Sequence, residues 1–154
     1  MTHPSCFRTI LVGDNGTPDA ARAVAVAVSL GEQLKAQVIL LGVLAPPSAE
    51  SQAEGYGLET HGDRRRKLQE HLELTAQAGR QRGVEVVAEL VEGMPEASIE
   101  ERAEHGGADL VVVGHRHLSR VRTWLEGSTS ENLVRRCSVS VLVVPDGDTD
   151  CQGC

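Results

Sequence analysis

Residues 37–45 read QVILLGVLA, a stretch in which almost every residue is apolar. An apolar run without polar alternation is typical of a strand that is covered on both faces, as in a parallel sheet. Two more strands of this kind are expected at Thr9–Val12 (TILV) and Asp109–Val113 (DLVVV). Because parallel strands need long crossover connections, which are usually helical, the sequence between these runs should supply helices.

Helical segments do lie between the predicted strands. Pro18–Lys35 starts with a proline suited to a first helical turn and is apolar around most of its circumference. Ser128–Arg136 opens with Ser128-x-x-Glu131, a capping-box pattern. The remaining predicted elements are the helices Asp63–Arg82 and Pro95–His105 and the strands Val84–Glu92, near a sheet edge, and Val139–Val144. Strict alternation of strands and helices predicts an α/β fold with a doubly wound, five-stranded parallel sheet.

The length and composition of the chain limit the classes of protein that it can be. Its 154 residues are the length of one domain, which we expect over residues 1–145, followed by an acidic tail over residues 146–154 that carries Cys151 and Cys154. A net charge of -7 and a content of one Trp, one Tyr and one Phe argue against binding to nucleic acid or to an anionic membrane. Without a signal peptide or a membrane-spanning apolar run, we expect a cytoplasmic protein with reduced cysteines.

Positive charge gathers after the fourth predicted strand, although the chain as a whole is acidic. The sequence leads from there into a predicted helix N-terminus, where free N–H groups and the helix dipole can bind an anion. Gly127 would let the backbone approach a phosphate closely. These features favour phosphate recognition, and the alternative is an N-cap, a turn and a solvated basic face. The residues concerned are His115, Arg116, His117, Arg120 and Arg122, followed by Ser128, Thr129 and Ser130, whose hydroxyls would add donors.

Several other kinds of site lack support in the sequence. No GxxxxGK[ST] motif exists and no GxGxxG follows the first strand, so neither a Walker site nor a Rossmann dinucleotide site is expected. The segment 127–131 (GSTSE) lacks the second glycine of a hydrolase nucleophile elbow. His115 and His117 lie beside three arginines, a poor environment for a metal cation, so we expect no metal site there.

Three stretches of the sequence together resemble the universal stress protein family. They are residues 10–17 (ILVGDNGT), the segment VVVG(x)12GSTSENLV that begins at Val111, and residues 137–145 (CSVSVLVVP). The resemblance covers about residues 7–145. It implies a Rossmann-like, five-stranded parallel sheet of order 3-2-1-4-5 with helices on both faces. Nucleotide-binding members carry G-x2-G-x9-G-[ST] after the fourth strand; Gly114, Gly127 and Ser128 match this motif, and His117 replaces its second glycine.

The resemblance implies binding of an adenine nucleotide, ATP or AMP, and assigns roles to the matched positions. Gly127 and the three hydroxyl residues after it would bind the phosphates, Gly114 would admit the ribose and α-phosphate, and Val43 would face the adenine through its backbone. Asn15 stands where the family usually has an aspartate, and Asp14 comes one residue early. The complete set of candidate binding residues is Gly13, Asp14, Asn15, Val43, Gly114, Arg116, His117, Gly127, Ser128, Thr129 and Ser130.

The function that these roles imply is a regulatory module of the stress response, in which the bound nucleotide alters a surface read by another, unidentified protein. One alternative is a nucleotide-free scaffold, because some family members without the glycine motif do not bind ATP and the His117 side chain could block the phosphate path. Another is a slow ATP-hydrolysing enzyme in the same pocket. The sequence disfavours hydrolysis, since no general base is placed by a motif. Asn15 brings no charge to Mg²⁺, which weakens a magnesium-dependent reaction.

A homodimer is also implied by the resemblance, and the sequence gives it a physical counterpart. The strand Val139–Val144 is expected at an edge of the sheet. It is apolar and has no lysine or interior proline that would protect the edge from pairing. We therefore expect two copies of the chain to associate through this strand.

Overall fold

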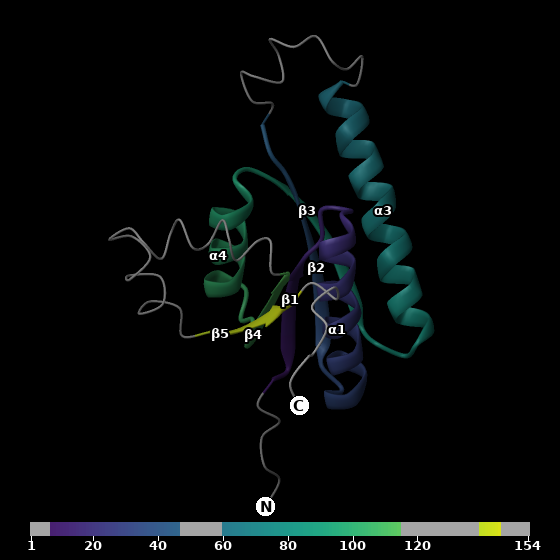
Figure 1. Ribbon diagram of the computed structural model, residues 1–154, viewed down its shortest axis with the longest axis vertical. Coiled ribbons are helices and arrows are strands. Elements are labelled where there is room, and N and C mark those ends of the chain that lie inside the picture. The colour runs from purple at the N-terminus through teal and green to yellow at the C-terminus, as the bar shows by residue number, and fades with distance from the viewer. Residues whose placement is uncertain (1–6, 47–59, 115–138, 146–154) are drawn as a thin grey trace, which may run out of the picture.

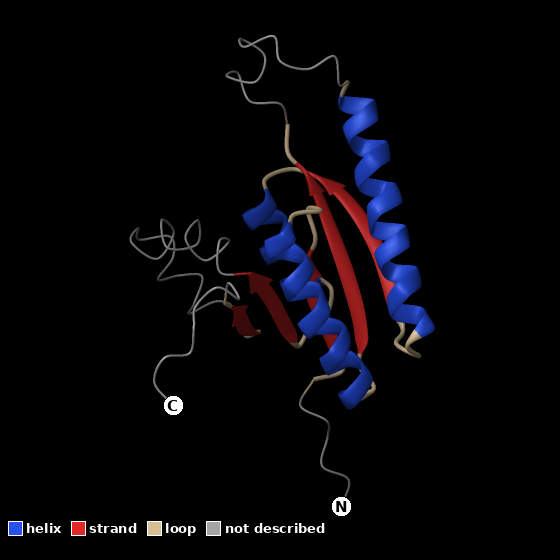
Figure 2. Cartoon of the chain, turned by 45° about the vertical axis from the view of Figure 1, so that its right-hand side comes forward, coloured by secondary structure: helices blue, strands red, loops and turns tan. Residues whose placement is uncertain are grey.

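The computed structural model describes residues 7–46, 60–114 and 139–145. Within these residues five parallel strands form one sheet of order β3-β2-β1-β4-β5, which confirms the predicted doubly wound α/β fold (Figures 1 and 2). The strands are β1 (Thr9–Gly13), β2 (Gln37–Leu44), β3 (Val86–Glu92), β4 (Leu110–Gly114) and β5 (Ser140–Val144). The helices are α1 (Pro18–Leu34), α3 (His61–Gln81) and α4 (Pro95–His105).

Helices cover both faces of the sheet, as the continuous apolar strands predict (Figure 1). On one face, Ile10 and Val12 of β1 pack in a buried cluster with residues of α1 and α3. On the other face, Leu11 packs in a second cluster that includes Ala103 of α4. Successive residues of a strand point to opposite faces, so a strand between two helical layers must be apolar at every position. This requirement explains why TILV and QVILLGVLA do not alternate.

The predicted elements agree with the observed ones to within about two residues at their ends, which is the usual uncertainty of an element boundary. β3 is an edge strand of the sheet, as predicted, and β5 forms the other edge. The predicted helix Ser128–Arg136 and the tail 146–154 lie outside the described residues. Across the described ranges, none of the helices is long and apolar enough to cross a membrane.

Two features fix α3 in its place on the sheet. At its start, Thr60 and Asp63 form a reciprocal capping box, and the hydrogen bonds from Thr60 lower the pKa of the Asp63 carboxyl. Along its length, α3 packs closely on β2, because a Cβ atom at Gly42 would lie 2.5 Å from Leu72 Cδ1 and 3.3 Å from Leu68 Cγ. The missing side chain at position 42 therefore lets the helix approach the strand, and every residue on that helix face lies near the sheet.

Because all five strands are parallel, the carboxyl ends of β1, β2 and β4 meet at one edge of the sheet. β1 is the central strand: Gly13 pairs with Leu41 of β2 on one side, and Val12 pairs with Val112 of β4 on the other. The chain passes from β1 to β2 and later crosses to β4, so the direction of winding reverses at β1. Ligands of open α/β sheets bind at such switch points, beyond the carboxyl ends of the strands.

Candidate functional site

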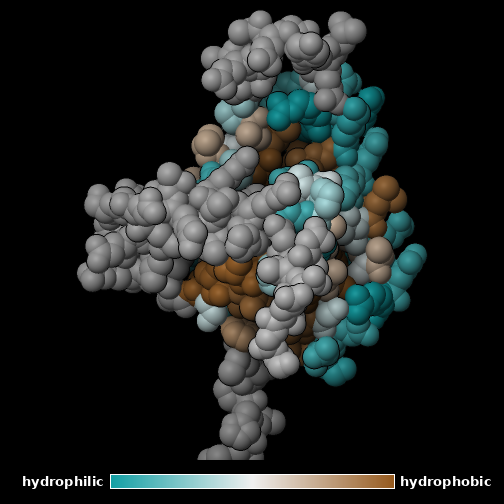
Figure 3. Space-filling view, viewed as in Figure 1, coloured by the Kyte–Doolittle hydropathy of each residue, from teal (hydrophilic) through white to brown (hydrophobic). Residues whose placement is uncertain are grey.

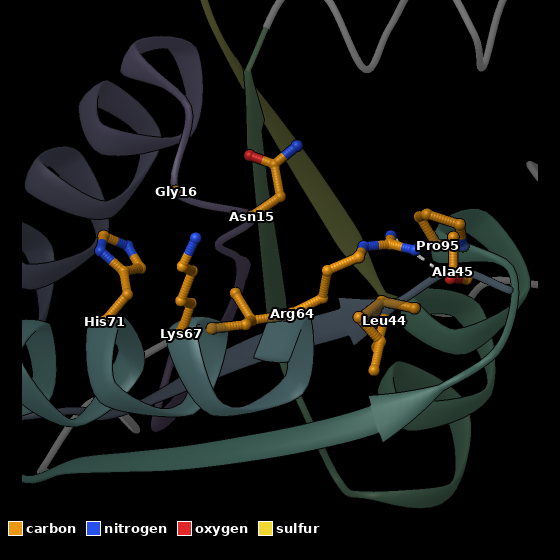
Figure 4. A pocket seen from close by; sticks show the side chains of 10 residues that line it. Asn15, Gly16, Leu44, Ala45, Arg64, Lys67, His71 and Pro95 are labelled. Carbon is orange, nitrogen blue, oxygen red and sulfur yellow. Dashed lines mark hydrogen bonds between the residues drawn. The ribbon is translucent and has the colours of Figure 1, made fainter. Parts of the chain in front are cut away.

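A pocket of about 500 Å³ opens at the carboxyl ends of β1 and β2 (Figure 4). Its volume lies within the range of about 300–1,000 Å³ that is typical of small-molecule sites. The lining residues come from the loop after β1, the end of β2, the face of α3 and the start of α4. They are Asn15, Gly16, Val43, Leu44, Ala45, Arg64, Lys67, Leu68, His71 and Pro95. The predicted residues Asn15 and Val43 are thus brought together in one pocket.

The loop after β1 is held by its own hydrogen bonds. Asn15 Oδ1 accepts hydrogen bonds from the backbone N–H of Thr17 at 3.2 Å and from its hydroxyl at 2.7 Å. Thr17 in turn caps α1, where its Oγ1 accepts from Ala20 N. Gly16 has a φ of +80°, a conformation that favours glycine. With Oδ1 engaged in this way, the amide nitrogen of Asn15 is the group that can donate to an acceptor in the pocket.

Asp14, the carboxylate that precedes Asn15, is not among the residues that line the large pocket. Its residue is only 4% exposed, and its backbone N–H donates to Leu41 O at 2.9 Å. Both carboxylate oxygens lie 2.9 Å from His71 Nε2 of α3, and Oδ1 also accepts from Gly16 N at 3.0 Å. Asp14 lines a small adjoining cavity of about 40 Å³ together with Gly13. The structure therefore gives Asp14 a bonding role between the β1 loop and α3.

Three nitrogen-bearing side chains of α3 face the pocket, and the sequence analysis did not single them out. Arg64, Lys67 and His71 are spaced by three and four residues, which places them on one face of a helix. Figure 4 shows Lys67 and His71 rising from α3 toward the loop that carries Gly16, and Arg64 extending toward Ala45 at the end of β2. The sequence signal that could have found them is the basic run 64–67 (RRRK), which stands at the start of a helix in an acidic chain.

The neighbouring cations of this run face elsewhere and meet carboxylates. Arg65 and His61 both contact Glu92 at the end of β3, and the hydrogen bond from His61 together with Arg65 holds the pKa of that carboxyl below its usual range. Arg66 pairs with Asp63 one turn earlier, at 3.4 Å. In the space-filling view, hydrophilic residues run along the outer side of α3 (Figure 3). The basic run is therefore divided between a solvent-facing part and a pocket-facing part.

The pocket is positive, although the chain carries a net charge of -7. None of its ten described lining residues is acidic, whereas two are permanently cationic. Val43, Leu44 and Pro95 add an apolar surface beside the polar groups. This donor set fits an anion attached to an apolar body and does not fit Mg²⁺, which requires oxygen ligands and usually carboxylates. Within the described residues, no three His, Cys, Asp or Glu side chains gather into a metal site.

Gly114 and Gly13, two predicted site residues, lie at strand ends where a side chain would collide with a helix at position 114 and make a tight contact with one at position 13. A Cβ atom at Gly114 would lie 2.8 Å from Asp19 Cγ in the first turn of α1, and one at Gly13 would lie 3.2 Å from Ile99 Cδ1 of α4. Close packing thus gives each glycine a structural reason of its own. The other predicted site residues, Arg116, His117, Gly127, Ser128, Thr129 and Ser130, lie outside the described residues.

The sheet order and the position of the pocket define a doubly wound α/β protein with a binding cleft at its topological switch point. Sequence comparison identifies the kind of α/β protein. The profile of the universal stress protein family matches residues 7–145, and the chain belongs to that family.

Individual relatives agree with this assignment. The chain is 27% identical over 139 residues to a universal stress protein of Methanocaldococcus jannaschii, a match that covers 90% of this chain and 82% of the relative. A crystal structure of a universal stress protein in complex with cAMP is 28% identical, with a TM-score of 0.63 over 90% of this chain and 97% of the other. A family member from Burkholderia pseudomallei is 25% identical, with a TM-score of 0.67 over 94% and 100% of the two chains.

Proposed function

We propose that this protein is a cytoplasmic homodimer that binds an adenine nucleotide, ATP or AMP, and acts as a regulatory module of the stress response. The observation that carries the proposal is the positive, partly apolar pocket at the switch point of the sheet. A nucleotide has an apolar base, a hydroxyl-bearing sugar and an anionic phosphate, and the pocket offers a partner for each. A relative that is 28% identical has been crystallised with cAMP, which supports the same ligand class.

In the proposed complex, the adenine lies beside Val43 at the end of β2, where the family resemblance puts it, and Leu44 and Pro95 provide apolar contact. The amide nitrogen of Asn15 donates to a ribose hydroxyl. Gly127 and the hydroxyl residues Ser128–Ser130 at the start of the predicted helix contribute phosphate donors. These assignments concern binding and not hydrolysis, because the described pocket wall contains no carboxylate that could serve as a general base.

Isothermal titration calorimetry of the purified chain with adenosine, AMP, ATP and cAMP tests the binding proposal. We expect micromolar affinity for at least one adenine nucleotide, and no comparable binding of the matching uridine nucleotide. Circular dichroism would establish that the protein used is folded. Flat titrations with folded protein at millimolar nucleotide would refute nucleotide binding and would favour the nucleotide-free scaffold.

The homodimer is proposed through the edge strand β5. Val141 in the middle of this strand is 57% exposed, although it is apolar, and a second copy of the strand would cover it. Val141→Lys should therefore convert a dimeric mass to a monomeric one in size-exclusion chromatography with light scattering. Leu74→Lys is the matched control, because Leu74 is an equally apolar exposed residue on α3. A monomeric mass of the wild type at tens of micromolar would refute the dimer.

A further inference from the structure

Arg64 and Lys67 place two positive charges on the α3 wall of the pocket. We propose that these two side chains bind a phosphate group of the nucleotide, so that α3 supplies the discrimination between adenine nucleotides and uncharged adenosine. The inference rests on the proposed function, because it concerns the same pocket. It adds a phosphate-binding element on a helix far in sequence from the glycine-containing segment on which the family resemblance rests.

The helix geometry puts both cations on the wall of one pocket, where Lys67 points toward the loop that carries Gly16 and Arg64 points toward Ala45 (Figure 4). Arg64 and Lys67 are three residues apart, so they are neighbours on one face of α3. That face is held against the sheet by the close packing of Leu68 and Leu72 on Gly42. Two cations on a helix whose position is fixed form a prearranged site, and a ligand does not have to order the backbone that carries them.

Arg64 retains the capacity to bind an anion in its observed position. Its Nη2 donates to the carbonyl oxygen of Ala45 at 3.5 Å, a contact that orients the side chain along the end of β2 (Figure 4). A guanidinium has five N–H donors in a planar fork, so the group that is steered by this carbonyl still has donors for phosphate oxygens. Lys67 contributes a second, compact charge on the same wall of the pocket.

Two arginines of the same helix differ from Arg64 in the partners that they contact. Arg65 contacts Glu92 and Arg66 contacts Asp63, so a carboxylate already balances each of these charges. Arg64 bonds to a neutral carbonyl. A phosphate that enters the pocket would meet no acidic side chain among its described lining residues. Arg66 is consequently a suitable control position: it lies in the same turn, carries the same charge and faces a carboxylate.

His71 is a third pocket-lining residue of α3, one turn beyond Lys67, and it helps to hold the helix in position. Its Nε2 is engaged with Asp14, so the pair ties α3 to the β1 loop that carries Asn15 and Gly16. The distance between the sugar-binding loop and the cationic face of α3 is thereby fixed. His71 is a positioning residue in this arrangement, and the phosphate contacts come from the two permanent cations.

Calorimetry on matched variants tests the proposal. The variants are Arg64→Gln, Lys67→Gln and the control Arg66→Gln, each titrated with AMP and with adenosine. Arg64→Gln and Lys67→Gln should each weaken AMP binding about tenfold, the loss expected for one charge-assisted contact. Adenosine binding should stay unchanged, and Arg66→Gln should leave both affinities at the wild-type value. Thermal melts would show that glutamine at these helix positions preserves the fold.

The two ligands separate failure of the inference from failure of the proposed function. If wild type binds AMP and adenosine, and the ratio of their affinities is the same in Arg64→Gln, Lys67→Gln and Arg66→Gln, the inference is overturned while the proposed function stands. If neither ligand binds to folded wild type, the proposed function fails and the inference falls with it. Equal weakening of AMP and adenosine binding would also overturn it, because the cations would then support the pocket without contacting phosphate.

The chain offers an independent test, because Lys35 and Lys67 are its only lysines. Both are exposed, and Lys35 caps the far end of α1, so it serves as an internal control. Trace acetylation with an N-hydroxysuccinimide ester, followed by mass spectrometry, would compare the two amines in one sample. Saturating AMP should slow acetylation of Lys67 several-fold and leave Lys35 unaffected, whereas adenosine should protect neither. Equal protection of Lys67 by adenosine and AMP would contradict a phosphate contact.

Discussion

The pair formed by His71 and Asp14 leads to a sharp prediction about stability. The Asp14 side chain is 3% exposed, and two groups donate to it: His71 Nε2 at 2.9 Å and the backbone N–H of Gly16 at 3.0 Å. His71→Ala removes one of these donors from a buried carboxylate. We expect the free energy of unfolding to fall by about 2 kcal/mol, because leaving a buried charged group short of a partner costs about 1–3 kcal/mol or more. The cost stays below the 3–5 kcal/mol typical of a fully buried pair, since His71 is 40% exposed and water can enter the space it leaves.

The matched control is His61→Ala in the same helix. His61 Nε2 lies 3.3 Å from Glu92 Oε1, but the Glu92 side chain is 52% exposed and stays hydrated when the histidine is lost. This second substitution should change stability by less than about 0.5 kcal/mol. Urea denaturation followed by circular dichroism, at one protein concentration and pH, measures both values. Equal losses in the two variants would refute the argument from burial. So would an unchanged cost of His71→Ala in an Asp14→Asn background, where the charge is absent.

Two further predictions concern the packing of the helices on the sheet. Arg102 of α4 donates to both carboxylate oxygens of Glu89, at 2.7 and 2.8 Å, and its guanidinium holds the pKa of Glu89 below the usual range. Because the folded pKa of Glu89 is lowered, this stabilisation is present above the ordinary glutamate pKa and is lost as the pH falls through the folded value. Arg102→Ala should lower the free energy of unfolding by about 1 kcal/mol at pH 7. The difference between the urea midpoints of wild type and variant should shrink in acid. Gly42→Ala should destabilise the protein by about 1–3 kcal/mol, because the added Cβ meets the buried Leu72. Gly62→Ala, in the open first turn of α3, should be neutral or stabilising. Equal thermal midpoints of these two variants would contradict the close approach of α3 to β2.

The strands were the part of the fold that the sequence predicted most directly. A parallel strand between two helical layers must be apolar on both faces, and QVILLGVLA has this property at nearly every position. The order of the strands in the sheet could not be predicted in this way, because alternation of strands and helices is compatible with more than one order. Order 3-2-1-4-5 entered through the family resemblance, and the pairing of β1 with both β2 and β4 confirms it.

The candidate site was predictable only in part, since its residues meet through tertiary contacts. Asn15 could be placed because it follows β1 and strand ends share an edge of the sheet, whereas Val43 was assigned through the family resemblance. Asp14 and His71 are 57 positions apart in the sequence, and no local sequence pattern predicts their contact. Arg64 belongs to a run of four cations that reads as a solvated helix face. Only the packing of α3 on β2 determines which members of the run turn toward the pocket.

The position of the Asp14 carboxylate bears on both the packing of α3 and the charge of the pocket. If the acidic residue stood at position 15, its charge would lie in the pocket opposite Arg64 and Lys67, where it would compete with a phosphate for the same cations. In this chain the acid stands at position 14, directly after the last residue of β1. Asp14 is buried against His71, and the neutral amide of Asn15 lines the pocket. The shift by one residue uses the carboxylate to hold α3 in place and leaves the pocket without an acidic side chain among its described lining residues, which favours the anionic ligand that we propose.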